Sequence, residues 1–358
     1  MKLKEILNLR IENQLLNSTI FKKPSEIIQW FCGIQGQDYE QSKWAIGLRL
    51  PGMTDELVEK AYANRSIIRT WLMRGTLHIV SAQDIHWLTD LLAPRLKSSQ
   101  TGRNKELELD DKIFKKCNAV FNKILKGNKE LTREELAAAL EKSGIDSSSM
   151  RLYHILQNAG LDHVLCFGKR RGKQFTFTLL NEKIEPGKSK QREEALVELA
   201  KRYFTSRGPA TLKDFIWWSG LSTSDARLAI ELSKSDMEEI TFGDQAYFLS
   251  SKLSNKIKSN NKSFLIPAFD EYIIAYKDRN VSLDSSHSNQ VITVNGIFKP
   301  VIVHDGLVKG IWKRTFTKDK VKINTYPFKA FDKKILKSID ESANLYSLYT
   351  DKKLLLSV

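Results

Sequence analysis

The sequence predicts a mainly α-helical protein that also contains β-structure, an α+β fold of three successive units followed by a C-terminal β-domain. Two patterns lead to this prediction. Three helix-like stretches followed by a β-hairpin recur along the chain, and alternating apolar runs with tight turns follow residue 256. The 358 residues are enough for several hydrophobic cores, so we expect domains at 1–105, 106–186, 187–255 and 256–358.

The first segment, 1–105, fits the repeated pattern loosely. Helices are expected near residues 25–35, 41–49 and 54–64. They lead into "IIRTWLMRGTLHIV", which contains two β-like runs around Arg74-Gly75. The segment therefore has the same order of elements as the two that follow it.

The second segment, 106–186, shows the pattern most clearly. Its helices are expected over "DKIFKKCNAVFNKILKG", "LTREELAAALEKSG" and "SSSMRLYHILQNAGL". Thr132 and Glu135 have the spacing of a capping box, and Gly144 is a suitable helix end. The β-like runs of "HVLCFGKRRGKQFTFTLL" then surround a tip that carries Lys169, Arg170, Arg171 and Lys173. Three helices followed by a hairpin with a basic tip are the order of a winged helix.

The third segment, 187–255, repeats that order with a shorter hairpin. Its helices are expected over "QREEALVELAKRYFTSRG", "ATLKDFIWWSG" and "STSDARLAIELSKS". Thr211 and Ser222 are suitable N-caps for the second and third of these helices. The strands of "MEEITFGDQAYFLS" are expected to turn at Gly243-Asp244. The three tandem units together make a weak internal repeat.

The last segment, 256–358, differs in composition from the rest. A polar, basic linker, "SNKIKSNNKS", precedes it, and a helix-like stretch ends it. Asn295-Gly296 and Asp305-Gly306 are strong hairpin turns between alternating apolar runs. A small antiparallel sheet or barrel with a terminal helix is the expected structure.

The charge of the chain favours an acidic partner. Lysine and arginine number 57 against 42 acidic residues, which gives a net charge of +15 and suggests nucleic acid or an anionic membrane surface. No run approaches the ~20 apolar residues of a membrane span, and the charged N-terminus does not fit a signal peptide, so we expect a cytoplasmic protein. The three cysteines are expected to be buried free thiols, and no Cys/His spacing predicts a metal site.

The basic residues of the second segment suggest contact with DNA. Winged helices commonly place the third helix in the major groove and the wing on phosphates. Here the third helix offers only Arg151 and His154, whereas the wing carries four cations between residues 169 and 173. The wing either contacts phosphates or is a solvated hairpin tip. Since paired Asn or Gln base readers are not evident, sequence-independent binding is favoured over operator recognition.

Two glutamines separated by one residue stand out in "WFCGIQGQDYEQSKWAIGLRL". In a helix, Gln35 and Gln37 point about 200° apart, whereas in an extended segment they share a face. Gly33 and Gly36 allow the backbone to leave helical geometry. Either one glutamine is an ordinary surface residue, or the helix breaks and both amides point into one place. Spacing alone favours the first interpretation.

Several other polar residues are weaker candidates for a site. His78 follows Arg74 and Thr76 on a predicted strand, and it either faces a cleft or is a core histidine satisfied by backbone. Asp270 and Glu271 in "AFDEY" are paired carboxylates, for which a structural ion-pair network is the preferred interpretation and a cleft lining the alternative. Trp217 and Trp218 are expected in the core. Trp312 is expected to form a basic edge with Lys313 and Arg314, and these two cations are expected to contact DNA.

The motifs "GIQGQ", "WLMRGTLHIV", "RRGKQFTFTLL", "GPATLKDFIWWSGL", "IPAFDEYIIAYKDR" and "NGIFKPVIVHDGLVKGIWKR" together resemble the AlkZ-type DNA glycosylases, nearly from end to end and in the order of that family. The resemblance implies three winged-helix units and a β-domain around a basic DNA cleft. It also implies excision of N7-alkylated purines and unhooking of interstrand crosslinks in double-stranded DNA, without a cofactor, in a bacterial, nucleoid-associated protein. We expect a monomer.

The resemblance also gives the two glutamines a role. The catalytic signature of that family is two glutamines around one residue, which Gln35-Gly36-Gln37 matches, although Gly36 replaces the usual bulkier alanine. An N7-alkylguanine or N3-alkyladenine already carries a positive charge, so it leaves without a general acid, and a neutral amide suffices to hold a water beside C1′. A non-enzymatic DNA-binding regulator is the alternative. A nuclease is less well supported, since only Asp270-Glu271 offer clustered carboxylates.

Overall fold

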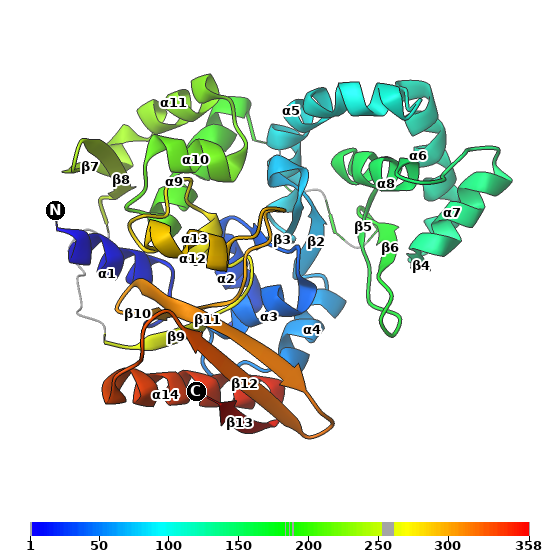
Figure 1. Ribbon diagram of the computed structural model, residues 1–358. Coiled ribbons are helices and arrows are strands. Elements are labelled where there is room, and N and C mark those ends of the chain that lie inside the picture. The colour runs from blue at the N-terminus through cyan, green and yellow to red at the C-terminus, as the bar shows by residue number, and fades with distance from the viewer. Residues whose placement is uncertain (1, 183, 186, 188–189, 253–260, 358) are drawn as a thin grey trace. The chain divides into compact units, whose positions relative to one another are not determined.

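A computed structural model describes residues 2–182, 184–185, 187, 190–252 and 261–357 (Figure 1). The chain forms two compact units, which we call the N/C unit (Met1–Lys60 with Leu196–Val358) and the middle unit (Ala61–Ala195). Helices α4 (Asp55–Ala63) and α9 (Arg192–Arg207) carry the chain from one unit to the other. The division at residue 60 falls inside the expected domain 1–105, so the four-domain division stays a prediction.

The expected α+β fold, mainly helical, is confirmed. The N/C unit contains α1 (Leu3–Asn13), α2 (Pro24–Phe31), α3 (Tyr39–Gly47), α10 (Leu212–Ser219), α11 (Thr223–Leu232), α12 (Glu271–Ile274), α13 (Ser288–Val291) and α14 (Lys333–Thr350). Its strands are β1 (Ile34–Gln35), β7 (Met237–Phe242), β8 (Gln245–Ser250), β9 (Ser263–Ile266), β10 (Val301–His304), β11 (Leu307–Phe316), β12 (Lys320–Pro327) and β13 (Lys353–Ser357). The middle unit contains α5 (Ile85–Glu106), α6 (Asp111–Leu125), α7 (Arg133–Lys142), α8 (Arg151–Leu161), β2 (Ile67–Trp71), β3 (Leu77–Ser81), β4 (Leu131–Thr132), β5 (Leu165–Phe167) and β6 (Thr176–Leu179).

The middle unit follows the order expected for 106–186. Three helices, α6 to α8, are followed by the hairpin of β5 and β6, and β4 completes a three-stranded sheet in the order β4-β6-β5. The predicted capping box of α7 is present, because the Thr132 hydroxyl accepts from the Glu135 N–H and the Glu135 carboxylate accepts from the Thr132 N–H. The apolar faces of these elements share one core.

The β2–β3 hairpin is attached to that same core. Trp71 at the end of β2 packs on the rings of Phe167 and Phe177, with centroids 5.0 and 6.2 Å away. The tip of the hairpin is held by Gln157 of α8, whose side-chain amide donates to the Gly75 carbonyl at 2.6 Å. The bond between Gln157 and Gly75 and the aromatic cluster around Trp71 therefore fix the hairpin within the middle unit.

The elements expected for 187–255 are present in the N/C unit. The Thr211 and Ser222 hydroxyls cap α10 and α11, as predicted from their positions. The chain between β7 and β8 turns at Gly243, which has a φ of +58°. A bridge between Ala210 and Phe248 adds a third extended segment beside the hairpin.

The C-terminal β-domain is an open sheet rather than a barrel. Its order is β13-β12-β11-β10-β9, and β10 turns into β11 at Asp305-Gly306 as predicted. The expectation of an antiparallel sheet is wrong at one edge, because β13 runs parallel to β12 after the terminal helix. The expected hairpin at Asn295-Gly296 is reduced to a tight turn, which is closed by the isolated bridge Ile292–Phe298. Pro300 lies two residues beyond this bridge, and it has no N–H with which to extend the pairing.

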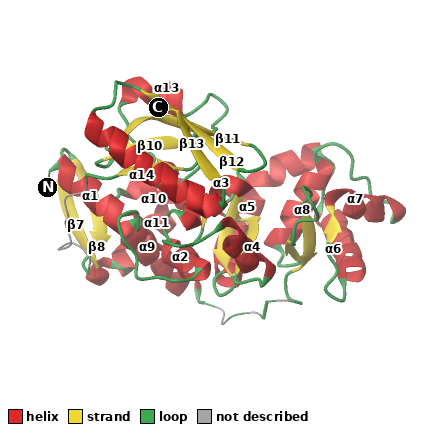
Figure 2. Ribbon diagram, turned by 90° about the horizontal axis from the view of Figure 1, so that it is seen from below, coloured by secondary structure: helices red, strands yellow, loops and turns green. Residues whose placement is uncertain are grey.

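Helix α14 covers one face of this sheet (Figure 2). Ser338 and Ser342 on α14 accept hydrogen bonds from the backbone N–H groups of Ser263 and Leu265 on β9. Trp44 of α3 and Trp312 of β11 are buried against the same strand and donate to the carbonyls of Leu265 and Ile266, both at 2.8 Å. Trp44 thus attaches α3 to the sheet, and Trp312 is a core residue bonded to β9 rather than an edge residue.

The remaining expectations concern cysteines, membrane spans and the linker. Cys32, Cys117 and Cys166 are buried free thiols as predicted, and burial raises the pKa of Cys117 to about 11. Among the described residues, no helix has the length and apolarity to span a bilayer. Residues 253–260, which form most of the expected linker, lie outside the described residues.

Candidate active site at the break between two helices

The segment with the two glutamines lies at a break between helices α2 and α3. Helix α2 ends at Phe31, where Cys32 (φ +54°) and Gly33 (φ +100°) take left-handed conformations. Ile34 and Gln35 are extended, and α3 starts after Asp38, whose carboxylate accepts the Gln41 N–H at 3.1 Å. The break that the sequence left open is therefore present, and Gly33 rather than Gly36 supplies the left-handed turn.

The two glutamines of this turn differ in exposure. The Gln35 side chain is almost fully buried, with 5% of the residue exposed, whereas Gln37 is exposed. The Gln35 backbone N–H donates to the Glu271 carboxylate (Oε1) at 2.9 Å. Gln35 thus lies in a fixed, buried position at the end of the short strand β1, and Gln37 lies at the surface in the bend that leads into α3.

Arg207, at the end of α9, holds the same turn from the other side. Its guanidinium donates to the carbonyls of Phe31 at 2.8 Å and Gly33 at 2.9 Å. It also forms an ion pair with Glu271 Oε2, with Nε and Nη2 at 2.9 and 2.7 Å, and the Trp218 indole donates to that oxygen at 2.9 Å. We call Arg207, Trp218 and Glu271 the turn clamp.

Sequence reasoning missed most of this clamp. Trp218 is buried as expected, but its bond to Glu271 and the whole role of Arg207 were not foreseen. A local sequence pattern cannot predict these contacts, because Arg207 lies 64 positions from Glu271 and 174 positions from Gly33. The only available signal was the paired carboxylate motif "AFDEY" itself.

The preferred interpretation of Asp270 and Glu271 as structural ion pairs agrees with the structure. Their partners, Arg49 and Arg207, lie 221 and 64 positions away in the sequence. Asp270 forms a two-pronged pair with Arg49, with both N–O distances 2.8 Å. The side chains of Arg49 and Asp270 are 2% and 1% exposed. The alternative that these carboxylates line an open cleft is wrong, because both are buried and occupied by arginines.

The three candidates near the β2–β3 tip lie in the middle unit. Arg74 takes a left-handed conformation (φ +58°), and the Thr76 hydroxyl donates to the Met73 carbonyl at 3.1 Å. His78 is fully buried, and its Nδ1 lies 3.1 Å from the Thr76 carbonyl, so this nitrogen carries the proton. The core interpretation of His78 thus accounts for this contact, and a catalytic contribution from the tip stays a prediction.

The basic wing lies between β5 and β6, where Gly172 has a φ of +62°. Arg171 pairs with Glu135 at 2.8 Å and donates to the Glu130 carbonyl, and Arg170 stacks on Phe175. Lys169 and Lys173 extend as exposed side chains. The wing is therefore pinned to the rest of its unit by arginines while its lysines face solvent.

The other predicted DNA contacts differ in how accessible they are. Arg151 donates to the Asp146 and Leu107 carbonyls, so most of its guanidinium is used within the protein. His154 is buried, which lowers its pKa, and nearby Arg103 lowers the pKa further. On β11, Lys313 is exposed beside the Tyr326 ring, and Arg314 is half-buried near Phe316. DNA contact at these positions stays a prediction.

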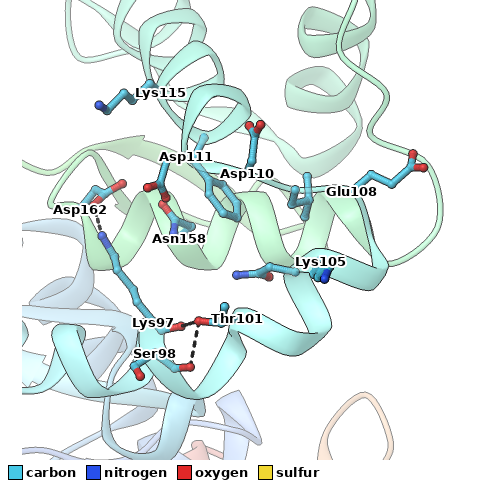
Figure 3. A pocket seen from close by; sticks show the side chains of 13 residues that line it. Lys97, Ser98, Thr101, Lys105, Glu108, Asp110, Asp111, Lys115, Asn158 and Asp162 are labelled. Carbon is cyan, nitrogen blue, oxygen red and sulfur yellow. Dashed lines mark hydrogen bonds and ion pairs between the residues drawn. The ribbon is translucent and has the colours of Figure 1, made fainter.

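A pocket of about 770 Å³ lies between α5, α6 and α8 of the middle unit (Figure 3). Lys97, Lys105 and Lys115 line it together with acidic residues, and Lys97 pairs with Asp162. None of the residues predicted for catalysis or DNA contact lines it. Nowhere in the described part of the chain do three or more His, Cys, Asp or Glu side chains form a group suited to a metal ion.

Comparison with known proteins identifies the family. The family model described as "DNA glycosylase AlkZ-like" matches residues 28–347. A curated relative, the "Interstrand DNA cross-link repair glycosylase" of Streptomyces sahachiroi, is 27% identical over 333 residues and 87% of each chain is covered. The solved structure of "Streptomyces sahachiroi DNA glycosylase AlkZ" has the same fold, with a TM-score of 0.83 at 23% identity over 100% of both chains. The chain therefore belongs to the family of AlkZ-like DNA glycosylases.

Proposed function

We propose that this glycosylase hydrolyses the N-glycosidic bond of cationic alkylated purines, N7-alkylguanine and N3-alkyladenine, in double-stranded DNA, and that it unhooks interstrand crosslinks built on such bases. Family membership supports the reaction class. The name of the Streptomyces relative supports the crosslinked substrate. The geometry of the turn at Gln35 and Gln37 supports the restriction to cationic bases.

The charge on the leaving base explains how two amides suffice. Water attacks C1′ while the bond from C1′ to the purine nitrogen breaks, and its electron pair neutralises the positive charge of the base. The water proton passes to solvent. Because the base leaves as a neutral molecule, no residue has to protonate it, which is the task of the carboxylic acid in glycoside hydrolysis. The protein has only to place the water.

One observation carries the proposal: the break between α2 and α3 presents Gln35 on a short strand and Gln37 in the bend that follows it, and the carboxylate that contacts this turn is fully used. Glu271 accepts the Gln35 N–H with one oxygen and three N–H groups with the other. It is buried and forms an ion pair with Arg207, so both of its oxygens are occupied by partners within the protein. A glutamine amide offers an acceptor oxygen and N–H donors, which are the groups that bind a water.

The exposure of Gln37 is compatible with a bulky lesion. Full extrusion of a base into a tight pocket is impossible when that base is still linked to the opposite strand. An amide at the surface can reach a lesion that stays in an open groove. Crosslink unhooking by the same turn is thus consistent with the burial of Gln35 and the exposure of Gln37.

The wing supplies a separate prediction about DNA affinity. Replacing both Lys169 and Lys173 with alanine is expected to lower the slope of log affinity against log salt by roughly 1.8, since each lost phosphate contact lowers it by about 0.9. Fluorescence anisotropy at several salt concentrations measures this slope. Arg171→Ala is the matched comparison, because Glu135 already pairs with that charge, and its slope should change less. An unchanged slope in the double variant contradicts the wing assignment.

The proposed reaction is tested by the release of free base. Wild-type protein is incubated with a duplex containing one N7-methylguanine and with a duplex containing a nitrogen-mustard crosslink. We expect free 7-methylguanine by mass spectrometry and conversion of the crosslinked duplex to separated strands on a denaturing gel. Tight binding of both duplexes without base release contradicts the proposal and favours a DNA-binding protein that has lost the activity.

A further inference from the structure

We propose that Arg207 and Glu271 are positioning residues of the base-excision reaction: they fix the backbone of the turn and hence the direction in which Gln35 and Gln37 present their amides. This inference rests on the proposed function of the two glutamines. It assigns to the junction of α9, α10 and α12 a part in catalysis, although these elements are far from the turn in sequence.

The clamp reaches alternate backbone groups along the turn. Arg207 binds the carbonyls of Phe31 and Gly33, and Glu271 binds the N–H of Gln35. Helix α2 ends at Phe31 and α3 starts only at Tyr39. The carbonyls of Phe31 and Gly33 therefore have no partner within a helix. The clamp therefore supplies the bonds that an ordinary helix end takes from water, and it defines the path of the chain up to the first glutamine.

The clamp itself has little freedom to move. Arg207 is 0% exposed and Glu271 2% exposed. The guanidinium carbon of Arg207 lies 4.2 Å from the centre of the Trp218 ring, and the Phe31 ring lies near it at 5.0 Å. Packing on these rings and the two-pronged bond to Glu271 hold the guanidinium in one plane. Because Glu271 is held in a rigid core, its carboxylate fixes the position of the Gln35 N–H.

Rigidity at this point matters for the rate. When a protein works mainly by holding a reactant in place, an error of about 1 Å in that placement costs on the order of 10²-fold. Loss of residues that orient direct contacts typically costs roughly 10–100-fold in metal enzymes, which work by the same logic. Gly36, between the glutamines, gives the backbone more freedom than a bulkier residue, so the bonds of the clamp help to restrain the direction of the two amides.

Two substitutions distinguish an effect on the direction of the two amides from a general loss of stability. Glu271→Gln keeps the shape of the side chain but offers one acceptor oxygen in place of two, so the Gln35 N–H or the Arg207 and Trp218 donors lose their partner. Trp218→Phe keeps an aromatic ring on Arg207 and removes one bond to Glu271. The matched control is Asp270→Asn, which alters an equally buried ion pair and keeps a cap acceptor for α12. Its partner Arg49 donates to the Gln14 and Ala45 carbonyls rather than to the backbone of the turn, although its guanidinium carbon lies 5.0 Å from the centre of the Phe31 ring.

The experiment combines a structural and a kinetic measurement at a temperature where all variants are folded by circular dichroism. Hydrogen exchange of the peptide covering 32–37 reports the Gln35 N–H, and single-turnover release of 7-methylguanine reports the chemistry. For Glu271→Gln we expect faster exchange in that peptide and a rate lowered by roughly 10–100-fold with unchanged DNA affinity. Trp218→Phe should show a smaller loss, and Asp270→Asn should retain the wild-type rate.

Each other outcome contradicts a defined part of the account. Faster exchange at 32–37 with a wild-type rate in Glu271→Gln overturns the positioning role. An equal loss of rate in Asp270→Asn also overturns it, since the loss is then general destabilisation. If wild-type protein releases no base while Glu271→Gln still loosens the peptide, the proposed function fails and the clamp is only structural.

Discussion

Truncating Gln37 to alanine is expected to lower the single-turnover rate of 7-methylguanine release by about 10²–10³-fold, the loss typical when one preorganised polar group is removed from an active site. Gln37 is exposed and lies in the bend before α3, so its removal should change the free energy of unfolding by less than about 0.5 kcal/mol. DNA affinity should stay within twofold. Quench-flow or manual quench at saturating enzyme measures the rate directly.

The same loss is expected for Gln35→Ala, and the two losses should not add. If both amides hold one water, removing either releases it, and the double variant should be only slightly slower than each single variant. Gln245→Ala is the matched control, because it removes an exposed amide at the start of β8. A rate within threefold of wild type in Gln35→Ala or Gln37→Ala contradicts the two-amide site.

Replacing Asp270 with alanine is expected to destabilise the protein by about 3–5 kcal/mol, because it leaves Arg49 as an unpaired buried charge. The effect includes the loss of the side-chain cap of α12, since Asp270 accepts from the Tyr272 N–H at 2.9 Å. Urea unfolding followed by circular dichroism and tryptophan fluorescence measures the change.

Glu56→Ala provides the comparison for that measurement. Glu56 pairs with Lys60 on α4, but the two side chains are 77% and 64% exposed. An exposed pair of this kind contributes little to stability because solvent screens the two charges, so the variant should unfold close to wild type. If Asp270→Ala unfolds at the same urea concentration as Glu56→Ala, the buried Arg49–Asp270 pair does not stabilise the N/C unit.

Local patterns predicted much of the fold. Caps at Thr132, Thr211 and Ser222 and turns at Gly243 and Asp305-Gly306 are present where the sequence indicated them. These features depend on residues within about four positions of one another, so a single sequence contains the necessary information. The turn at Asn295-Gly296 is also present, but the residues beside it form an isolated bridge instead of a hairpin. Strand pairing depends on partners that lie far away in the sequence.

The candidate site shows where such reasoning stops. The spacing of Gln35 and Gln37 raised the possibility of a helix break, and the structure has that break. The residues that hold it come from positions 207, 218 and 271, and nothing in the local sequence connects them. The parallel pairing of β13 with β12 was missed for the same reason, because α14 separates the two strands along the chain.

The central claim is that the charge of the leaving base replaces a general acid at this turn. One duplex with an N7-methylguanine near one end and a uracil near the other, each end carrying its own fluorophore, tests it within a single reaction. After incubation, an abasic endonuclease nicks the DNA wherever a base has been lost. We expect nicking only at the methylguanine. Nicking at uracil at a comparable rate contradicts it, because release of that uncharged base requires an acid that Gln35 and Gln37 do not supply.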